Sequence, residues 1–156
     1  MTAVVDWAPV LDADPLLQIT QDLFATMIDD EPGHVSHWVG ERPALEDARY
    51  TWVDVTDEQI VRVVIGTGRE TGEAITRALL TMAPGEEVTD EDFIDAVGEV
   101  ANVVCGNVKS LVTHPGTLTI PVVADAAPPL GEGERLVDAC LSWRGAPLTV
   151  SLWVLP

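Results

Sequence analysis

The sequence predicts an α+β protein in which helices are layered on one face of a mostly antiparallel sheet. The predicted elements follow the order helix, hairpin, two helices and three strands, so strands and helices do not alternate as they do around a parallel sheet. Several strand segments alternate apolar and polar residues and are separated by turn residues, which is typical of antiparallel pairing. Residues 89–112 form one long segment with helical apolar spacing.

The composition indicates one folded domain, residues 1–156, in which residues 1–14 are a short N-terminal arm. Apolar residues make up 47% of the chain and the mean hydropathy is +0.20, which argues against disorder. The formal net charge of −18 disfavours contact with nucleic-acid phosphates and with anionic membrane surfaces. We therefore expect no nucleic-acid partner and no membrane partner.

Both cysteines and the first residues indicate a cytoplasmic protein. Residues 1–15 carry acids and no basic start, so no signal peptide is visible, and no apolar run approaches the ~20 residues that span a bilayer. Cys105 and Cys140 lie in apolar surroundings, far apart in sequence and without a C-x-x-C motif. Free thiols in a reducing cytosol are the interpretation that fits this pattern.

The first helix is predicted to begin at Asp14 and Pro15, because an acid can cap a helix and proline suits its first turn. Its apolar stripe continues to about Ile28. In the arm before it, Trp7 is expected to pack on the domain as an anchor. After the helix, residues 36–39 have the pattern of a short strand within an otherwise irregular stretch.

That irregular stretch contains His34 and His37, which are spaced as H-x-x-H. A metal site would need more ligands at compatible positions, and the sequence offers no obvious partner for the pair. Surface histidines are therefore the preferred interpretation, and no metal site is predicted.

The middle of the chain predicts a hairpin followed by a helix. Residues 49–56 and 59–65 alternate as two strands should. The glycine-rich stretch at residues 66–72 lacks the lysine and the spacing of a G-x-x-x-x-G-K-[ST] phosphate loop. We interpret residues 66–72 as a loop that only connects the second strand to a helix over residues 71–82.

The C-terminal part of the chain predicts three strands. Residues 117–123 form a strand that contains Pro121, which places it at an edge or a bulge of the sheet. Residues 124–133 predict a loop rich in alanine, proline and glycine. Residues 134–143 and 147–155 predict a final hairpin.

The long segment between these parts has the end signals of a single helix. Thr89 can cap it, three acids fill the first turn where the helix dipole favours negative charge, and Pro115 and Gly116 end it. At about 100° per residue, one side of this helix is apolar and is expected to be buried. The residues on that side are Phe93, Val97, Val100, Ala101, Val104, Val108 and Leu111.

The opposite side carries a polar stripe whose members are spaced by four, three, four and three residues. They are Asp95, Glu99, Asn102, Gly106 and Lys109, and Lys109 is the only lysine of the chain. A polar outer face is also what an ordinary surface helix presents. The Asn102 amide has a donor and an acceptor and could hold a water in line with a phosphoryl group, whereas Glu99 is suited to pairing with a partner's lysine.

These residues carry a family resemblance. Asp95-x-x-x-Glu99-x-x-Asn102, followed by Gly106-Asn107-x-Lys109-Ser110, resembles the signature helix of the CheC/CheX/FliY phosphatases of bacterial chemotaxis. The single copy of the motif and the chain length make the chain most similar to the CheX type. The resemblance implies a CheC/CheX-like fold and hydrolysis of the acyl phosphate on a phosphorylated, CheY-like receiver domain of a response regulator.

The resemblance also implies a role for each matched residue. Glu99 would grip a lysine of the receiver domain, and Asn102 would orient the attacking water. Asp95, Gly106 and Lys109 would contact the partner. The receiver domain would supply Mg²⁺, so the chain would need no metal or cofactor of its own.

Two other readings of the same helix face stay open. The chain could be a non-catalytic module that binds a receiver domain or a flagellar-switch partner, or a ligand-binding or structural homodimer whose motif is vestigial. Decay of a phosphorylated receiver with the wild type, Asn102→Ala and Glu99→Ala discriminates among them. A homodimer is expected from the family and because sheet edges need covering.

Overall fold

The computed structural model describes residues 5–156 and contains one antiparallel sheet. Along most of its long strands, buried and more exposed side chains alternate, as expected for a sheet with one covered face. The elements in chain order are η1 (Ala8–Val10), α1 (Ala13–Met27), β1 (Val35–His37), β2 (Ala48–Thr56), β3 (Ile60–Gly68), α2 (Arg69–Leu79), α3 (Asp90–Leu111), β4 (Thr117–Leu118), β5 (Val122–Ala124), β6 (Glu134–Trp143) and β7 (Ala146–Leu155). The strand order is β1-β6-β7-β3-β2-β4, and β5 also pairs with β2.

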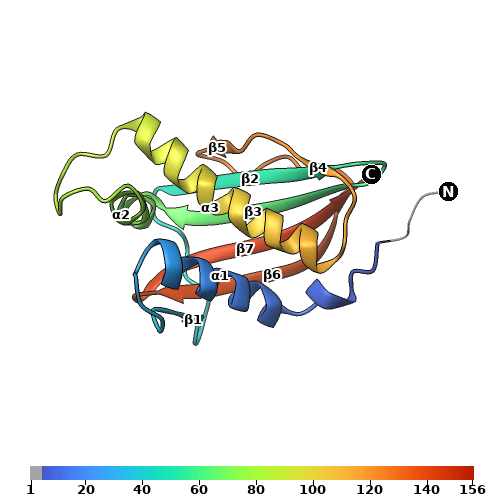
Figure 1. Ribbon diagram of the computed structural model, residues 1–156, viewed down its shortest axis with the longest axis horizontal. Helices are drawn as coiled ribbons and strands as arrows, with labels where there is room; N and C mark the ends of the chain where they lie inside the picture. The colour runs from blue at the N-terminus through green and yellow to red at the C-terminus, as the bar shows by residue number, and fades with distance from the viewer. Residues whose placement is uncertain (1–4) are drawn as a thin grey trace.

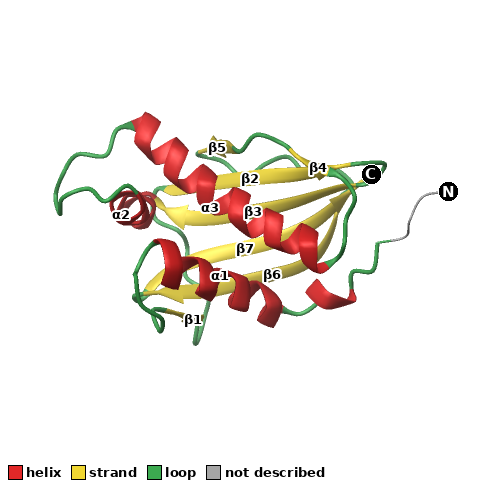
Figure 2. Cartoon of the chain, viewed as in Figure 1, coloured by secondary structure: helices red, strands yellow, loops and turns green. Residues whose placement is uncertain are grey.

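The helices α1 and α3 lie on one face of this sheet, and α3 crosses it diagonally (Figures 1 and 2). Every strand pair in the sheet is antiparallel. The predicted α+β class, with helices layered on a mostly antiparallel sheet, is therefore confirmed. No helix within residues 5–156 is long and apolar enough to cross a membrane.

The core lies between the sheet and its two covering helices. Val53, Val63 and Leu152 are Cα partners across β2, β3 and β7, and all three side chains are fully buried. Because side chains alternate along a strand, Asp54 and Arg62 point to the other face. There Arg62 Nε donates to Asp54 Oδ1 over 2.7 Å and Nη2 donates to Asp54 Oδ2 over 2.9 Å.

The predicted apolar side of α3 is buried in this core with one exception. Its members from Phe93 to Val108 are all less than a tenth exposed. Leu111 was expected to be buried with them, and that expectation is wrong, since its side chain is 43% exposed. It is the last residue of α3, and no further helical turn follows to cover it.

The glycine-rich stretch at residues 66–72 is not a loop. β3 continues through Gly68, and α2 begins at the next residue. Gly66 is buried in the strand because its Cα lies against the Thr149 hydroxyl of β7, which leaves no space for a side chain. Gly66 therefore permits close approach of the neighbouring strand β7 and does not mark a turn.

Two further boundaries differ from the sequence prediction. α1 begins at Ala13, and Asp12 occupies the N-cap position that was predicted for Asp14. The Asp12 side chain makes no capping hydrogen bond. The predicted strand over residues 117–123 is two short strands, β4 and β5, which both pair with β2. Pro121 explains the interruption, because proline cannot donate a ladder hydrogen bond.

The C-terminal hairpin and the N-terminal anchor are as expected. β6 and β7 turn at Arg144 and Gly145, whose φ angles of 52° and 83° suit a two-residue hairpin turn. Trp7 is half-buried against the core, and its ring lies 6.3 Å from that of His114. Part of the arm, residues 1–4, lies outside the described residues.

Candidate functional site

Helix α3 is the platform of the candidate site. The Thr89 hydroxyl caps it by accepting a hydrogen bond from the Asp92 backbone N–H over 3.1 Å. Near its start, α3 packs on α2, where Gly72 lies so close to the Phe93 ring that a side chain at residue 72 would displace the ring. The buried side holds the helix on the sheet, so the opposite side is left for solvent or a partner (Figure 1).

The structure places the polar stripe on that free side, as predicted. Asp95 and Glu99 are exposed, and Asn102, Gly106 and Lys109 are half-buried. The roles assigned to the five residues remain predictions, but their common placement on one accessible face is a property of the fold.

Glu99 and Asn102 share one wall of an open groove. The other wall comes from the segment between β4 and β5, and the groove has a volume of about 420 Å³. We call it the α3 groove, and its lining consists of Glu99, Asn102, Val103, Leu118, Thr119, Ile120 and Pro121. The predicted water-orienting amide and the predicted docking carboxylate therefore face the same hollow.

The side-chain polar groups of Glu99 and Asn102 do not take part in holding the fold together. Within residues 5–156, the Glu99 carboxylate and the Asn102 amide make no hydrogen bond and no ion pair, whereas the neighbouring Asn107 amide donates to the Val103 carbonyl over 2.8 Å. The Asn107 amide is thus bonded to the backbone of its own helix. Glu99 and Asn102 keep their full hydrogen-bonding capacity for another molecule.

Lys109 stands apart from the other cations of the chain. All seven arginines form ion pairs with carboxylates, for example Arg62 with Asp54 and Arg144 with Asp29. Among the described residues Lys109 has no such partner. Within residues 5–156 of this chain, whose net charge is −18, the one lysine or arginine side chain without a carboxylate partner therefore lies on the stripe.

The sequence pattern does not reveal the second wall of the groove. Residues 118–121 have only the pattern of an edge strand. Pro121 and Gly98 are the available signals, because the proline interrupts the strand and the glycine lets that segment approach α3. Their contact is tertiary, and nothing in the local pattern indicates that the two residues meet.

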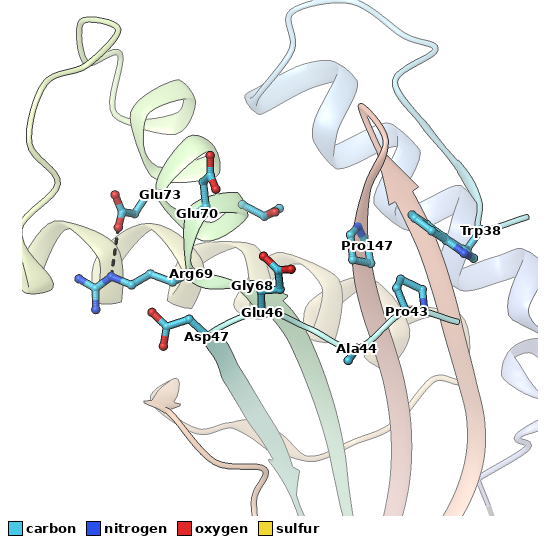
Figure 3. A pocket seen from close by; sticks show the side chains of 11 residues that line it. Trp38, Pro43, Ala44, Glu46, Asp47, Gly68, Arg69, Glu70, Glu73 and Pro147 are labelled. Atoms are coloured by element: carbon cyan, nitrogen blue, oxygen red, sulfur yellow. Dashed lines mark hydrogen bonds and ion pairs between the residues drawn. The ribbon is translucent and has the colours of Figure 1, made fainter. Parts of the chain in front are cut away.

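A larger cavity of about 510 Å³ lies at the start of α2, away from the stripe. Figure 3 shows Trp38, Pro43 and Pro147 on one side of it and the carboxylates of Glu46 and Glu70 on the other. It contains no histidine, no cysteine and none of the predicted site residues. The size of this cavity does not by itself indicate a catalytic or binding function, so the smaller α3 groove remains the candidate site.

The histidines and cysteines offer no competing centre. His34 and His37 bond to Glu31 and Asp14 respectively, at the surface. Between residues 5 and 156 no group of three or more His, Cys, Asp or Glu side chains could hold a metal ion. Both cysteines are free, and burial raises the pKa of the Cys105 thiol to about 12, far from the range of a reactive thiolate.

Comparison with known proteins decides the family. The family model described as chemotaxis phosphatase CheX matches residues 50–130, more than half of the chain. The chain belongs to the CheX family. The match includes α3 with all five stripe residues and extends through the segment that forms the other wall of the groove. No curated protein sequence matches this CheX family member at a significant level.

Solved structures agree with this fold over nearly the whole chain. The CheX–CheY–BeF₃–Mg²⁺ complex from Borrelia burgdorferi is 16% identical, with a TM-score of 0.69 over 98% of this chain and 100% of that one. A CheC-like superfamily protein from Shewanella sp. PV-4 is 19% identical, with a TM-score of 0.67 over 94% and 99%. The chemotaxis protein CheX from Vibrio vulnificus is 18% identical, with a TM-score of 0.65 over 90% and 94%.

Proposed function

We propose that this CheX family member hydrolyses the acyl phosphate of a CheY-like receiver domain. The observation that carries the proposal is the pair Glu99 and Asn102, which line one groove on an accessible helix face and have no partner within the described chain. Membership of the chemotaxis phosphatase family supports the reaction. The complex of the Borrelia burgdorferi CheX with CheY, BeF₃ and Mg²⁺ supports the class of partner.

The reaction needs little from the enzyme beyond positioning. An acyl phosphate on aspartate is already reactive, and phosphoryl transfer is accelerated mainly by alignment and charge stabilisation. The Asn102 amide can accept a hydrogen bond from a water and donate one to the phosphoryl group. The water oxygen then bonds to phosphorus while the bond from phosphorus to the aspartyl oxygen breaks, and the products are the aspartate carboxylate and inorganic phosphate.

Glu99 has a different task. Its carboxylate would repel a phosphoryl group, so it contributes by pairing with a lysine of the receiver domain. That charge-assisted contact fixes the docking geometry and places Asn102 against the phosphate. Asp95 and Lys109 add contacts along the stripe, and Gly106 allows close approach because its Cα faces open space.

The metal belongs to the partner in this proposal. Mg²⁺ held by the receiver domain would neutralise charge on the phosphoryl oxygens. The residues of this chain would only bind, orient the water and exclude competing contacts. We further propose that the protein works as a homodimer in the cytoplasm. Light scattering at micromolar concentration tests whether it is a dimer.

The deciding experiment follows the decay of a CheY-like receiver domain phosphorylated with acetyl phosphate. The wild type should accelerate decay. Asn102→Ala should lower kcat by roughly 100-fold while binding is kept, since removing one positioned polar group has effects of this size. Glu99→Ala should weaken both binding and turnover. Binding by the wild type without faster decay would instead indicate a non-catalytic receiver-binding module.

A further inference from the structure

The α3 groove has a polar wall and an apolar wall, and the proposed chemistry uses only the polar one. The apolar wall is formed by Leu118, Ile120 and Pro121. Ile120 is 87% exposed, so almost the whole side chain is open to a partner that enters the groove. Ile120 therefore stands in solvent beside Glu99 and Asn102, which have no partner within the described residues.

The backbone that presents Ile120 is held firmly on both sides. On one side, the Thr119 N–H donates to the Asp54 carbonyl over 2.8 Å, and the Thr119 hydroxyl accepts from the Asp54 N–H over 3.0 Å. On the other side, Pro121 lies on Gly98, where an added Cβ would come within 3.2 Å of the proline Cβ. Ile120 is therefore displayed at a fixed position and loses little freedom when it is buried by a partner.

Charge explains why an apolar contact matters at this site. The chain carries a net charge of −18, and the aspartyl phosphate that it approaches in the proposed reaction is itself anionic, so long-range electrostatics oppose the approach. Burial of an exposed isoleucine favours association without regard to charge, and the gain does not depend on screening by salt. It can therefore offset a repulsion that Lys109 alone does not cancel.

We propose that Ile120 is a docking residue that enters an apolar hollow on the receiver domain, next to the phosphorylation pocket that receives Glu99 and Asn102. This inference rests on the proposed phosphatase function, because the receiver domain is the protein that would occupy the α3 groove. Ile120 and the polar pair line one groove, so a protein that reaches Asn102 also covers Ile120. Ile120 is a positioning residue and does not touch the reacting atoms.

The test compares Ile120→Ala with the matched control Val39→Ala. Val39 is 92% exposed in the loop after β1 and is not part of the groove, so it reports the effect of removing any exposed apolar side chain. For a receiver that the wild type dephosphorylates, Ile120→Ala should raise KM roughly ten-fold and leave kcat within about two-fold. Ile120→Leu should keep the wild-type KM, because leucine retains the apolar surface. Val39→Ala should also have the wild-type KM and kcat.

Three results would overturn the inference. If the wild type accelerates decay and Ile120→Ala leaves KM unchanged, the docking role is wrong while the phosphatase function stands. If Ile120→Ala lowers kcat with no change in KM, or breaks a dimer seen by light scattering without affecting KM, the residue acts elsewhere. If the wild type does not accelerate decay of any CheY-like receiver, the proposed function fails and this inference fails with it.

Discussion

Pro121 lies directly against Gly98: a Cβ added to residue 98 would come within 3.2 Å of the proline Cβ and 3.5 Å of its Cγ. This contact joins the interrupted edge of the sheet to the helix that carries Glu99 at the next position. It is the reason that the polar and apolar walls of the groove belong to one surface. Most of the following predictions test this surface and the helix beneath it.

Gly98→Val should destabilise the protein and open the groove. The branched side chain would overlap Pro121, and overpacking of a closely packed contact typically lowers the free energy of unfolding by about 1–3 kcal/mol. Urea denaturation measures the loss, and receiver dephosphorylation should show a raised KM. Equal stability of Gly98→Val and the wild type would mean that the 117–124 segment moves away without cost.

Gly106→Ala should separate stability from activity. A Cβ at residue 106 meets no atom within 4 Å, and alanine in a helix is favoured over glycine by roughly 0.5–1 kcal/mol, so the free energy of unfolding should rise. Dephosphorylation should nevertheless slow, because the methyl group stands on the face that the receiver approaches. Thr26→Ala on the exposed side of α1 is the control, and it should leave turnover unchanged.

Lys109→Ala should weaken receiver binding in a salt-dependent way. Lys109 is the unpaired cation of the stripe, and its attraction to an acidic partner is strong at about 0.01 M salt and largely screened at about 1 M. The ratio of mutant to wild-type dissociation constants should therefore fall as salt is added. Arg135→Ala removes an exposed cation on β6 that pairs with Asp138 and does not line the α3 groove, and it should show no such trend. A ratio that is independent of salt would contradict the electrostatic role.

Cys105 should make the protein less stable at high pH. Burial raises the pKa of its thiol from 9.0 to about 12, so the folded state favours the neutral form. The associated stability is fully present below pH 9 and is lost as pH rises through about 12, by up to about 1.4 kcal/mol per pH unit. Urea denaturation from pH 8 to 11 should show this slope in the wild type, and Cys105→Ala should reduce it.

The hairpins and α3 could be predicted because their signals are local. Alternation in β2, β6 and β7 follows from side chains that point to opposite faces of a strand, and Thr89 caps α3 by a bond to a residue three positions away. The stripe from Asp95 to Lys109 is likewise set by 3.6 residues per turn. For these elements, neighbouring residues carry the decisive interactions.

Two of the differences from the predicted structure lie where a distant partner decides the structure. Gly66 looked like part of a loop, but its lack of a side chain serves close contact with Thr149 of β7. The edge segment looked like one strand, but Pro121 splits it into two, each of which pairs with β2. Glycine and proline have the same local signal in either role, and only the neighbouring strand distinguishes the roles.

The amino-acid sequence by itself determined the α+β class, the long capped helix, the family signature and the residues on its outer face. Helical periodicity and capping act over a few residues, which makes these features readable along the chain. Only the tertiary structure decided that Leu118, Ile120 and Pro121 stand opposite Glu99 and Asn102. That placement depends on pairing of β4 and β5 with β2 and on the contact of Pro121 with Gly98, and both join residues more than twenty positions apart.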